Sequence, residues 1–147
     1  MISLRRFTEQ DASLIQQKQY TDMRISDIQE LIAAWETNTC QGRHFEMYAI
    51  AVNDATVGSA SLYEHTKSTV SIGIEVYPDE RGKGYASEGM RLILNRARIL
   101  GYRIVQDQVR ADNESSIALH NSLGFETDGY LYKNAQGRDV LLYLLCL

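Results

Sequence analysis

The sequence predicts one α/β domain over residues 1–147, with a mixed central sheet of about seven strands and about four helices. Three observations predict it. Apolar residues recur with a period of two in some runs and of three to four in others, so strands and helices are both indicated. Three strand-like runs follow one another across short polar turns, which is typical of an antiparallel meander. A helix then leads to a fourth run, and such a crossover places two strands in parallel.

The N-terminal region is expected to form one strand and two helices. Ile2 and Leu4 alternate with polar residues at the start of the chain, as in a strand. Thr8 is placed to cap a first helix, and the hydroxyl of Ser26 to cap a second one. The second helix then has its apolar residues on one face: Ile28, Leu31, Ile32 and Trp35.

The predicted meander occupies the middle of the chain. Phe45–Asn53 and Thr56–Glu64 are separated by a short polar turn, which is typical of a hairpin. The third strand, Thr69–Tyr77, follows another short turn and ends at Pro78. Four apolar residues alternate along it with less apolar ones: Val70, Ile72, Ile74 and Val76.

A glycine loop, Arg81–Ala86, joins the third strand to a long helix that ends near Gly101. Its two glycines allow the backbone to bend and to approach a ligand closely. Unpaired N–H groups and the positive end of the dipole lie at a helix N-terminus, so a phosphate or pyrophosphate suits this place. Arg81 and Lys83 add positive charge. The alternative is an ordinary glycine turn that caps a helix.

The C-terminal region is expected to add three strands and a helix. Tyr102–Val109 follows the crossover and should lie parallel to the strand before the long helix. A last helix starts at Ala111–Asn113 and ends at Gly124 in a left-handed cap. Phe125–Lys133 and Asp139–Leu147 should form a hairpin, whose final, nearly all-apolar strand is expected to be buried.

Two stretches together suggest a family. Arg81, Gly84 and Ala86 fill the pattern Arg, x, x, Gly, x, Ala, and Asn113 begins a second stretch with Ser116 and, later, Gly124-Phe125. In this order and separation they resemble motifs A and B of the GNAT superfamily, the GCN5-related N-acetyltransferases. The resemblance implies a GNAT-like fold, in which two adjacent parallel strands splay apart at the cofactor site.

The same resemblance implies acetyl-CoA as co-substrate and no metal. Pantetheine would dock on the free backbone of the splayed strand, at Ile74, Glu75 and Val76, because an amide-bearing chain can pair there as an added strand. The pyrophosphate would meet the glycine loop. The cofactor-binding residues expected in this way are Ile74, Val76, Arg81, Gly82, Lys83, Gly84, Tyr85, Ala86, Asn113 and Ser116. For the last two, simple roles as helix cap and first-turn residue are the alternative.

Acetyl transfer to an amine needs a neutral amine, so a general base would help. Glu75 alternates with core-facing isoleucines and is expected to project toward the substrate. Many family members have a glutamate at the start of this strand, where this chain has Ser71, so the usual assignment does not carry over. Glu46 on the neighbouring hairpin is the reserve candidate. The backbone N–H of Val76 is the expected oxyanion donor.

A general acid would speed the departure of the thiolate. Many relatives place a tyrosine on the last helix where this chain has His120. Histidine can donate a proton near neutral pH, so His120 is a candidate acid, although it could equally be a helix histidine with satisfied hydrogen bonds. Tyr130 and Tyr132 on the following strand are alternative acids.

The composition excludes several classes. A net charge of −4 and a pI of about 5.3 argue against a nucleic-acid partner. No apolar run suggests a membrane span or signal peptide, so a cytoplasmic protein is expected. Cys40 and Cys146 have no disulfide or metal-ligand spacing and are interpreted as free thiols, Cys40 in a loop and Cys146 in the core. His44, His65 and His120 likewise form no metal motif.

The leading hypothesis is therefore a cytoplasmic acetyl-CoA-dependent N-acetyltransferase that acts by direct attack in a ternary complex. A catalytically weak CoA-binding sensor or interaction module is the alternative. The acceptor is a small-molecule or peptide amine, and the apolar final strand leaves room for a homodimer. Four residues around the first two helices either line the acceptor site or pack on the sheet: Tyr20, Met23, Arg24 and Trp35.

Overall fold

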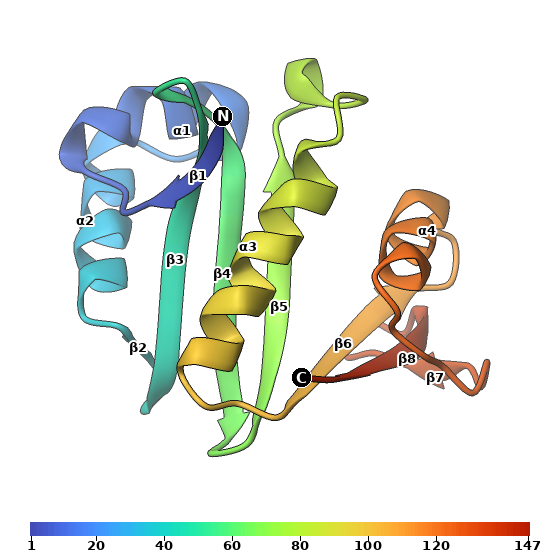
Figure 1. Cartoon of the computed structure of the whole chain (residues 1–147). Coiled ribbons are helices and arrows are strands. Elements are labelled where there is room, and N and C mark those ends of the chain that lie inside the picture. The colour runs from blue at the N-terminus through green and yellow to red at the C-terminus, as the bar shows by residue number, and fades with distance from the viewer.

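A mixed eight-stranded sheet forms the centre of the protein, in a computed structural model that describes all 147 residues (Figure 1). Its order is β1-β3-β4-β5-β6-β8-β7, and β2 pairs with β3 beside this path. The strands are β1 (Ile2–Arg5), β2 (Thr39–Cys40), β3 (Arg43–Val52), β4 (Ala55–Thr66), β5 (Thr69–Val76), β6 (Ile104–Arg110), β7 (Tyr132–Lys133) and β8 (Asp139–Cys146). The helices are α1 (Ala12–Lys18), α2 (Ile25–Glu36), α3 (Tyr85–Ile99) and α4 (Glu114–Ser122), with short 3₁₀ helices at Glu9–Asp11 and Pro78–Glu80. The predicted α/β class is confirmed.

Helices cover both faces of the sheet. Ala49 and Ile50 are neighbours on β3, so their side chains point to opposite faces. Ala49 belongs to an apolar cluster with residues of α1 and α2, whereas Ile50 packs in the main core with residues of α3. Figure 1 shows α4 set apart from these helices, beside β6 and β8. None of the helices combines the length and the apolar character that crossing a lipid bilayer requires.

One of the two helix caps predicted near the N-terminus, Thr8, is confirmed, and the other, Ser26, is not. Thr8 precedes the first 3₁₀ helix, and its backbone N–H donates to Asp11 Oδ2 at 2.7 Å. The predicted cap at Ser26 is wrong, because α2 begins before this residue and Arg24 takes the N-cap position. The Arg24 guanidinium pairs at 3.0 Å with Asp27, whose carboxylate lies in the first turn and suits the positive end of the helix.

The predicted meander is confirmed as β3, β4 and β5. Asn53 and Asp54 have φ values of 50° and 71°, as in the two-residue turns that match the twist of a hairpin. The register between β3 and β4 shifts at a bulge next to Gly58. There the backbone of β4 comes so close to β5 that a Cβ on Gly58 would lie 2.0 Å from the Glu75 carbonyl oxygen.

β5 and β6 are parallel, as the crossover predicts, but they pair over two residues only. Thr69 lies opposite Ile104 and Val70 opposite Val105. Beyond these pairs the strands separate, and Figure 1 shows β6 turning away from the plane of β3, β4 and β5. The expected splay between two parallel strands is therefore confirmed.

The C-terminal hairpin is shorter than predicted. The expected strand Phe125–Lys133 is wrong over most of its length, since only Tyr132–Lys133 pairs with β8 apart from one isolated bridge. Gly129 has a φ of +77°, and the side chains of Thr127 and Asp128 accept from backbone N–H groups two residues further on. Such local bonds replace the ladder that a strand would need.

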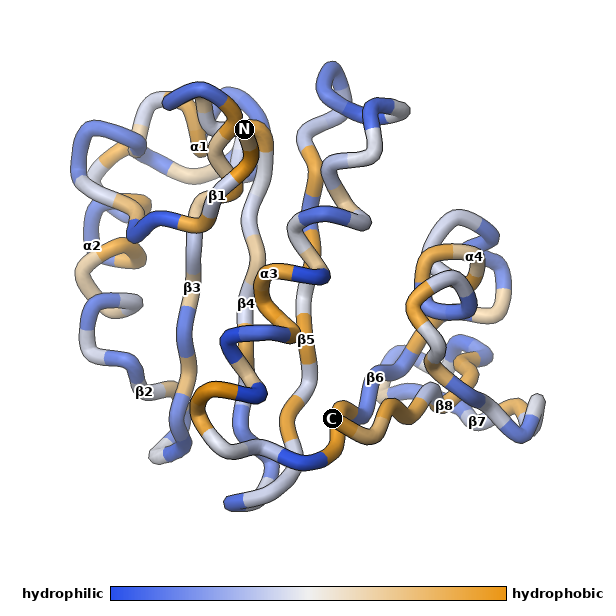
Figure 2. The backbone as a smooth tube through the Cα atoms, in the orientation of Figure 1, coloured by the Kyte–Doolittle hydropathy of each residue, from blue (hydrophilic) through white to orange (hydrophobic).

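β8 is half-exposed, although its sequence predicts a buried strand. Tyr143 lies in the core, whereas Leu144 is 43% exposed and Cys146 is also exposed, so the core placement of Cys146 is wrong. Leu144 points to the face of the sheet opposite to α3. On that face α1 and α2 pack on β3 and do not reach β8, so Leu144 stays uncovered. Figure 2 shows this hydrophobic stretch next to the C-terminus. Cys40 was expected in a loop and instead lies in the short strand β2.

Candidate functional site

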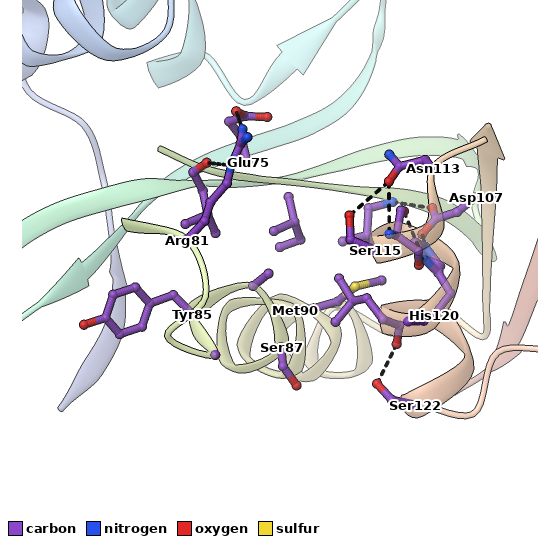
Figure 3. Close-up of a pocket in the computed structure, with 18 of the residues that line it drawn as sticks. Glu75, Arg81, Tyr85, Ser87, Met90, Asp107, Asn113, Ser115, His120 and Ser122 are labelled. Atoms are coloured by element: carbon purple, nitrogen blue, oxygen red, sulfur yellow. Dashed lines mark hydrogen bonds and ion pairs between the residues drawn. The ribbon is translucent and has the colours of Figure 1, made fainter. Parts of the chain in front are cut away.

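A cavity of about 870 Å³ lies between β5, the glycine loop, α3 and α4 (Figure 3). All of the predicted cofactor-binding residues except Lys83 line it, and so do Glu75 and His120. The fold thus brings the loop at residues 81–86 and the start of α4 to one place, although about 30 residues of chain separate them. Lys83 does not line the cavity; its Nζ forms an ion pair with Glu80 Oε2 at 3.0 Å.

The glycine loop ends in the N-terminus of α3. Gly82 and Gly84 have φ values of +78° and +83°, which only glycine adopts without strain, and Gly84 is the N-cap. No side chain caps this helix, so first-turn N–H groups remain available to an anion. Arg81 ties the loop to the strand, because its Nε donates to the Val76 carbonyl at 3.0 Å and its Nη2 lies 3.2 Å from Glu75 Oε1.

The edge of β5 above its pairing with β6 is open. The Ile72 N–H points toward β6, where it donates to Asp107, whereas the Tyr77 N–H points toward β4 and donates to Val57. Because this direction alternates along a strand, the N–H groups of Ile74 and Val76 also face the gap. They lie where an extended chain with amide groups can pair with them.

Asn113 caps α4 and also faces the cavity. Its Oδ1 accepts from the backbone N–H of Ser116 at 3.1 Å and from the hydroxyl of Ser115 at 3.2 Å. These bonds are the helix-cap and first-turn roles that the sequence allows. Both Asn113 and Ser116 line the cavity.

A buried ion pair links β5, β6 and α4 at the inner end of the cavity. Asp107 Oδ1 accepts from the Ile72 N–H at 2.8 Å, and its Oδ2 lies 2.9 Å from His120 Nε2. His120 Nδ1 lies 2.8 Å from the Ser116 carbonyl oxygen. Each ring nitrogen faces an acceptor, an arrangement that favours the doubly protonated imidazolium, and the Ser116 hydroxyl also lies 3.4 Å from Nδ1. Burial lowers the pKa of His120, but the bonds to Asp107 and Ser116 outweigh it and raise this pKa above its ordinary value.

Sequence comparison assigns this site to a family. A profile described as "Acetyltransferase (GNAT) domain" matches residues 2–126. The chain belongs to the GNAT family. The L-methionine sulfoximine/L-methionine sulfone acetyltransferase of Pseudomonas aeruginosa is 32% identical over 77 residues, which are 52% of this chain and 45% of that protein. The L-amino acid N-acyltransferase MnaT of Escherichia coli is 28% identical over 102 residues, 67% of this chain and 59% of that protein. The chain thus spans about half the length of these curated relatives.

Solved structures show the same GNAT fold. The ribosomal L7/L12 α-N-protein acetyltransferase RimL, solved with coenzyme A, has a TM-score of 0.85 at 18% identity, over 99% of this chain and 94% of that one. The microcin C7 self-immunity acetyltransferase MccE, solved with acetyl-CoA and AMP, has a TM-score of 0.83 at 20% identity, over 99% and 92%. The likeness extends over nearly the whole chain and confirms the GNAT-like fold.

Glu75 lies on the face of β5 opposite to α3, because its neighbour Ile74 packs against the core on the α3 side. Figure 3 shows it paired with Arg81 at the edge of the cavity. Burial and the charge of Glu75 together raise the pKa of Tyr20. The buried Tyr77 hydroxyl, two residues along the same face, has no hydrogen-bond partner. The catalytic role of Glu75 stays a prediction.

The reserve candidate for the base, Glu46, lies away from the cavity. It is buried and does not line the cavity, and it accepts from Arg96 at 2.8 Å, from Tyr48 at 2.5 Å and from His44 at 2.8 Å. Burial alone would raise the pKa of Glu46, but these bonds outweigh it and lower the value to about 2. These bonds tie β3 to α3, and a carboxylate with so low a pKa is a weak base.

His120 matches the second of the two interpretations that the sequence allows, a histidine whose hydrogen bonds are satisfied, since neither ring nitrogen is free. The alternative acids, Tyr130 and Tyr132, lie outside the lining of the cavity. They stack on each other, with ring centroids 4.8 Å apart. Tyr130 is 64% exposed, because the segment before β7 is a loop and not the predicted strand.

Sequence analysis missed Asp107. It lies in β6 between Val105 and Val109, and all three side chains are buried. A carboxylate on the apolar face of a strand needs partners, so the pattern Val, x, Asp, x, Val was the signal that pointed to a buried polar contact. Its partner, His120, lies 13 residues further on in another element.

Proposed function

We propose that this GNAT protein is an acetyl-CoA-dependent N-acetyltransferase, which transfers the acetyl group to a primary amine by direct attack in a ternary complex. One observation supports it most. The open edge of β5 and the uncapped glycine loop lie in one continuous cavity, next to each other. An extended chain with amide groups that ends in a pyrophosphate matches these two features, and acetyl-CoA has this form.

The cofactor is proposed to run along the cavity. Its pyrophosphate binds the loop Arg81–Ala86, and its pantetheine pairs with the free edge of β5 at Ile74 and Val76. Asn113 and Ser116 contact the arm from α4. The coenzyme A and acetyl-CoA complexes of RimL and MccE, which have the same fold, support this proposal.

The amine approaches from the face of β5 that carries Glu75. Glu75 accepts a proton from the ammonium group, and the amine nitrogen then attacks the thioester carbon to form a tetrahedral intermediate. The Val76 N–H, which faces the gap, donates to the oxyanion. The C–S bond then breaks and the thiolate leaves, which its pKa of about 8.5 permits without a strong acid. The thiolate takes up the second proton of the attacking nitrogen, directly or through water, so the products are the amide and the CoA thiol. No protein nucleophile takes part.

The acceptor is proposed to be a small amine, with an amino acid as the first class to test. MnaT acts on L-amino acids by name, and the Pseudomonas relative on methionine sulfoximine and sulfone, which are amino-acid derivatives. Peptide amines form the second class, since RimL acetylates a ribosomal protein.

Calorimetric titration with acetyl-CoA, coenzyme A and ATP tests the cofactor assignment without an acceptor. We expect micromolar binding of both CoA species and little response to ATP. A screen of amines by thiol release then tests the transfer. Binding without any thiol release would favour the sensor module instead, which the ion-paired Glu75 and the fully bonded His120 keep open. No binding of either CoA species would contradict both functions.

Gly84→Val is expected to weaken acetyl-CoA binding by more than about tenfold, because a side chain at the N-cap would obstruct the pyrophosphate. The left-handed φ adds a stability loss of about 1–2 kcal/mol. Gly137→Val is the matched control, since Gly137 has a φ of +75° with open space around it and lies in the remote β7–β8 turn. Equal affinity of the two variants in calorimetry would contradict the pyrophosphate assignment.

Glu75→Gln is expected to leave acetyl-CoA affinity within about twofold and to lower turnover by about 100-fold. The amide keeps an oxygen for Arg81 but cannot take up the proton. Steady-state rates against pH measure the effect. Glu80→Gln is the control, because Glu80 directly precedes the glycine loop and pairs with Lys83 as Glu75 pairs with Arg81. Unchanged turnover would assign the proton to another group or to water.

A further inference from the structure

The ladder between β5 and β6 does not end abruptly. After the pair of Val70 with Val105, side chains provide the next two links. Ser71 Oγ donates to the Gln106 carbonyl at 2.5 Å, and the Ile72 N–H donates to Asp107 Oδ1 at 2.8 Å. A parallel ladder would have backbone bonds there. Each link instead inserts a side chain between the strands and so keeps them further apart than a ladder does.

The Asp107 link also fixes α4. Its second oxygen binds His120, which in turn donates to the Ser116 carbonyl in the same helix. The position is a junction, because the main cavity and a second one of about 370 Å³ share Ile72, Asp107 and Gln108 in their linings. His65 and Ser71 also line the second cavity, and Ser71 points to the face of β5 that carries Glu75.

We propose that Asp107 and His120 form a charged wedge that sets where the gap between β5 and β6 opens and how wide it is. The pair acts as positioning residues. It holds the edge of β5 and the start of α4 at the separation that the pantetheine arm needs, without touching the reacting atoms. The existence of the wedge is argued from the hydrogen bonds and strand positions alone. Its effect on catalysis rests on the proposed function.

The wedge depends on the protonation of His120. The polar groups that face the ring are the Asp107 carboxylate from β6 and the carbonyl and hydroxyl of Ser116 from α4, the hydroxyl at 3.4 Å from Nδ1. The rings of Phe125 and Tyr143 lie against it at 4.7 and 5.4 Å between ring centroids. No other charged group bonds to it. Because the pKa of His120 is raised in the fold, the stabilisation is full below the ordinary histidine pKa and is lost as pH rises through the folded value. A neutral ring must give up one of its two acceptors.

Two substitutions separate charge from geometry. In Asp107→Asn the amide oxygen still accepts from Ile72, and the amide NH₂ faces His120 Nε2, which suits a neutral ring protonated at Nδ1. This variant keeps both links and removes the charge. Asp107→Ala removes both links. Ser71→Ala is the matched control, because it removes the neighbouring link and leaves the ion pair intact.

The first measurement is nitrogen-15 NMR of the histidine rings, with His120→Gln for assignment, together with amide exchange. We expect His120 to be an imidazolium at pH 7 in the native protein and in Ser71→Ala, and neutral in Asp107→Asn. The Ile72 amide should exchange about tenfold faster in Asp107→Ala than in the native protein or Asp107→Asn, while the Val70 amide changes little. A neutral His120 in the native protein, or equal Ile72 exchange in all variants, would overturn the wedge.

The second measurement uses thiol release with an accepted amine. We expect Asp107→Ala to raise the KM for acetyl-CoA about tenfold or more, because the gap no longer matches the pantetheine arm. Asp107→Asn should keep a KM close to the native value and lose the rise of KM at alkaline pH that follows deprotonation of His120. An unchanged KM for acetyl-CoA in Asp107→Ala would overturn the positioning role. If the native protein binds no acetyl-CoA, the proposed function fails, and the ring and amide measurements still decide on the wedge.

Discussion

Gly58→Ala is expected to lower the free energy of unfolding by about 3 kcal/mol, because a Cβ cannot fit at this bulge. It would lie 2.0 Å from the Glu75 carbonyl oxygen and 2.9 Å from the Val76 Cα, both of which are backbone atoms. Rotation of a side chain cannot relieve such a contact, so β4 and β5 must move apart. The moved segment carries the free edge of β5, and acetyl-CoA affinity should fall as well.

Gly73→Ala is the control for this change. Gly73 lies on the same strand pair, but an added Cβ would meet only the hydroxyl of Ser61 at 2.5 Å, which can rotate away. We expect a loss of less than about 1 kcal/mol. Urea unfolding followed by circular dichroism measures both variants. Equal midpoints for the two would show that the bulge at Gly58 yields easily.

Arg96→Met is expected to lower the free energy of unfolding by about 3 kcal/mol at pH 7, because it leaves the buried carboxylate of Glu46 without its cation. Glu46→Gln combined with Arg96→Met should recover part of this loss, since the uncompensated charge is then gone. Urea unfolding of both variants measures the difference. A double variant no more stable than Arg96→Met would contradict this account.

The same ion pair predicts a pH dependence. Glu46 has a pKa of about 2 in the fold against an ordinary value of 4.5, so its stabilisation is present above pH 4.5 and is lost as pH falls toward 2. The stability difference between the native protein and Glu46→Gln should therefore shrink over this range. A constant difference between pH 7 and pH 3 would show that the charge of Glu46 contributes little.

The sequence predicted the elements whose signals are local. The meander, the glycine loop and the long helix all follow from periodicity and turn residues within about ten positions, and the cavity assembles around them. The predicted strand Phe125–Lys133 failed because Thr127, Asp128 and Gly129 form local turns that compete with a ladder. The final strand is as apolar as predicted, but its exposure depends on which helices cover the sheet.

The candidate site shows the same division. The loop residues that line the cavity could be named from their order in the chain, whereas the cation beside Glu46, Arg96, is 50 residues away in sequence and could not. The contact of Asp107 with His120 and Ile72 also joins three separate elements. A contact between a buried charge and a partner far away in the chain leaves no periodic pattern in the sequence. Such contacts can therefore be identified only from the structure.

The short pairing of β5 with β6 leaves few backbone bonds between the C-terminal segment and the rest of the sheet, although the two share one hydrophobic core. Residues 104–147 hold β6, β7, β8 and α4, which pair among themselves and join the rest of the sheet through only two ladder positions. Such a segment can open at a lower free energy than the whole domain unfolds. The cavity lies between this segment and the rest of the domain, so a ligand bound there contacts both parts and raises the free energy of opening by mass action. The stability of this segment is therefore expected to depend on the bound ligand.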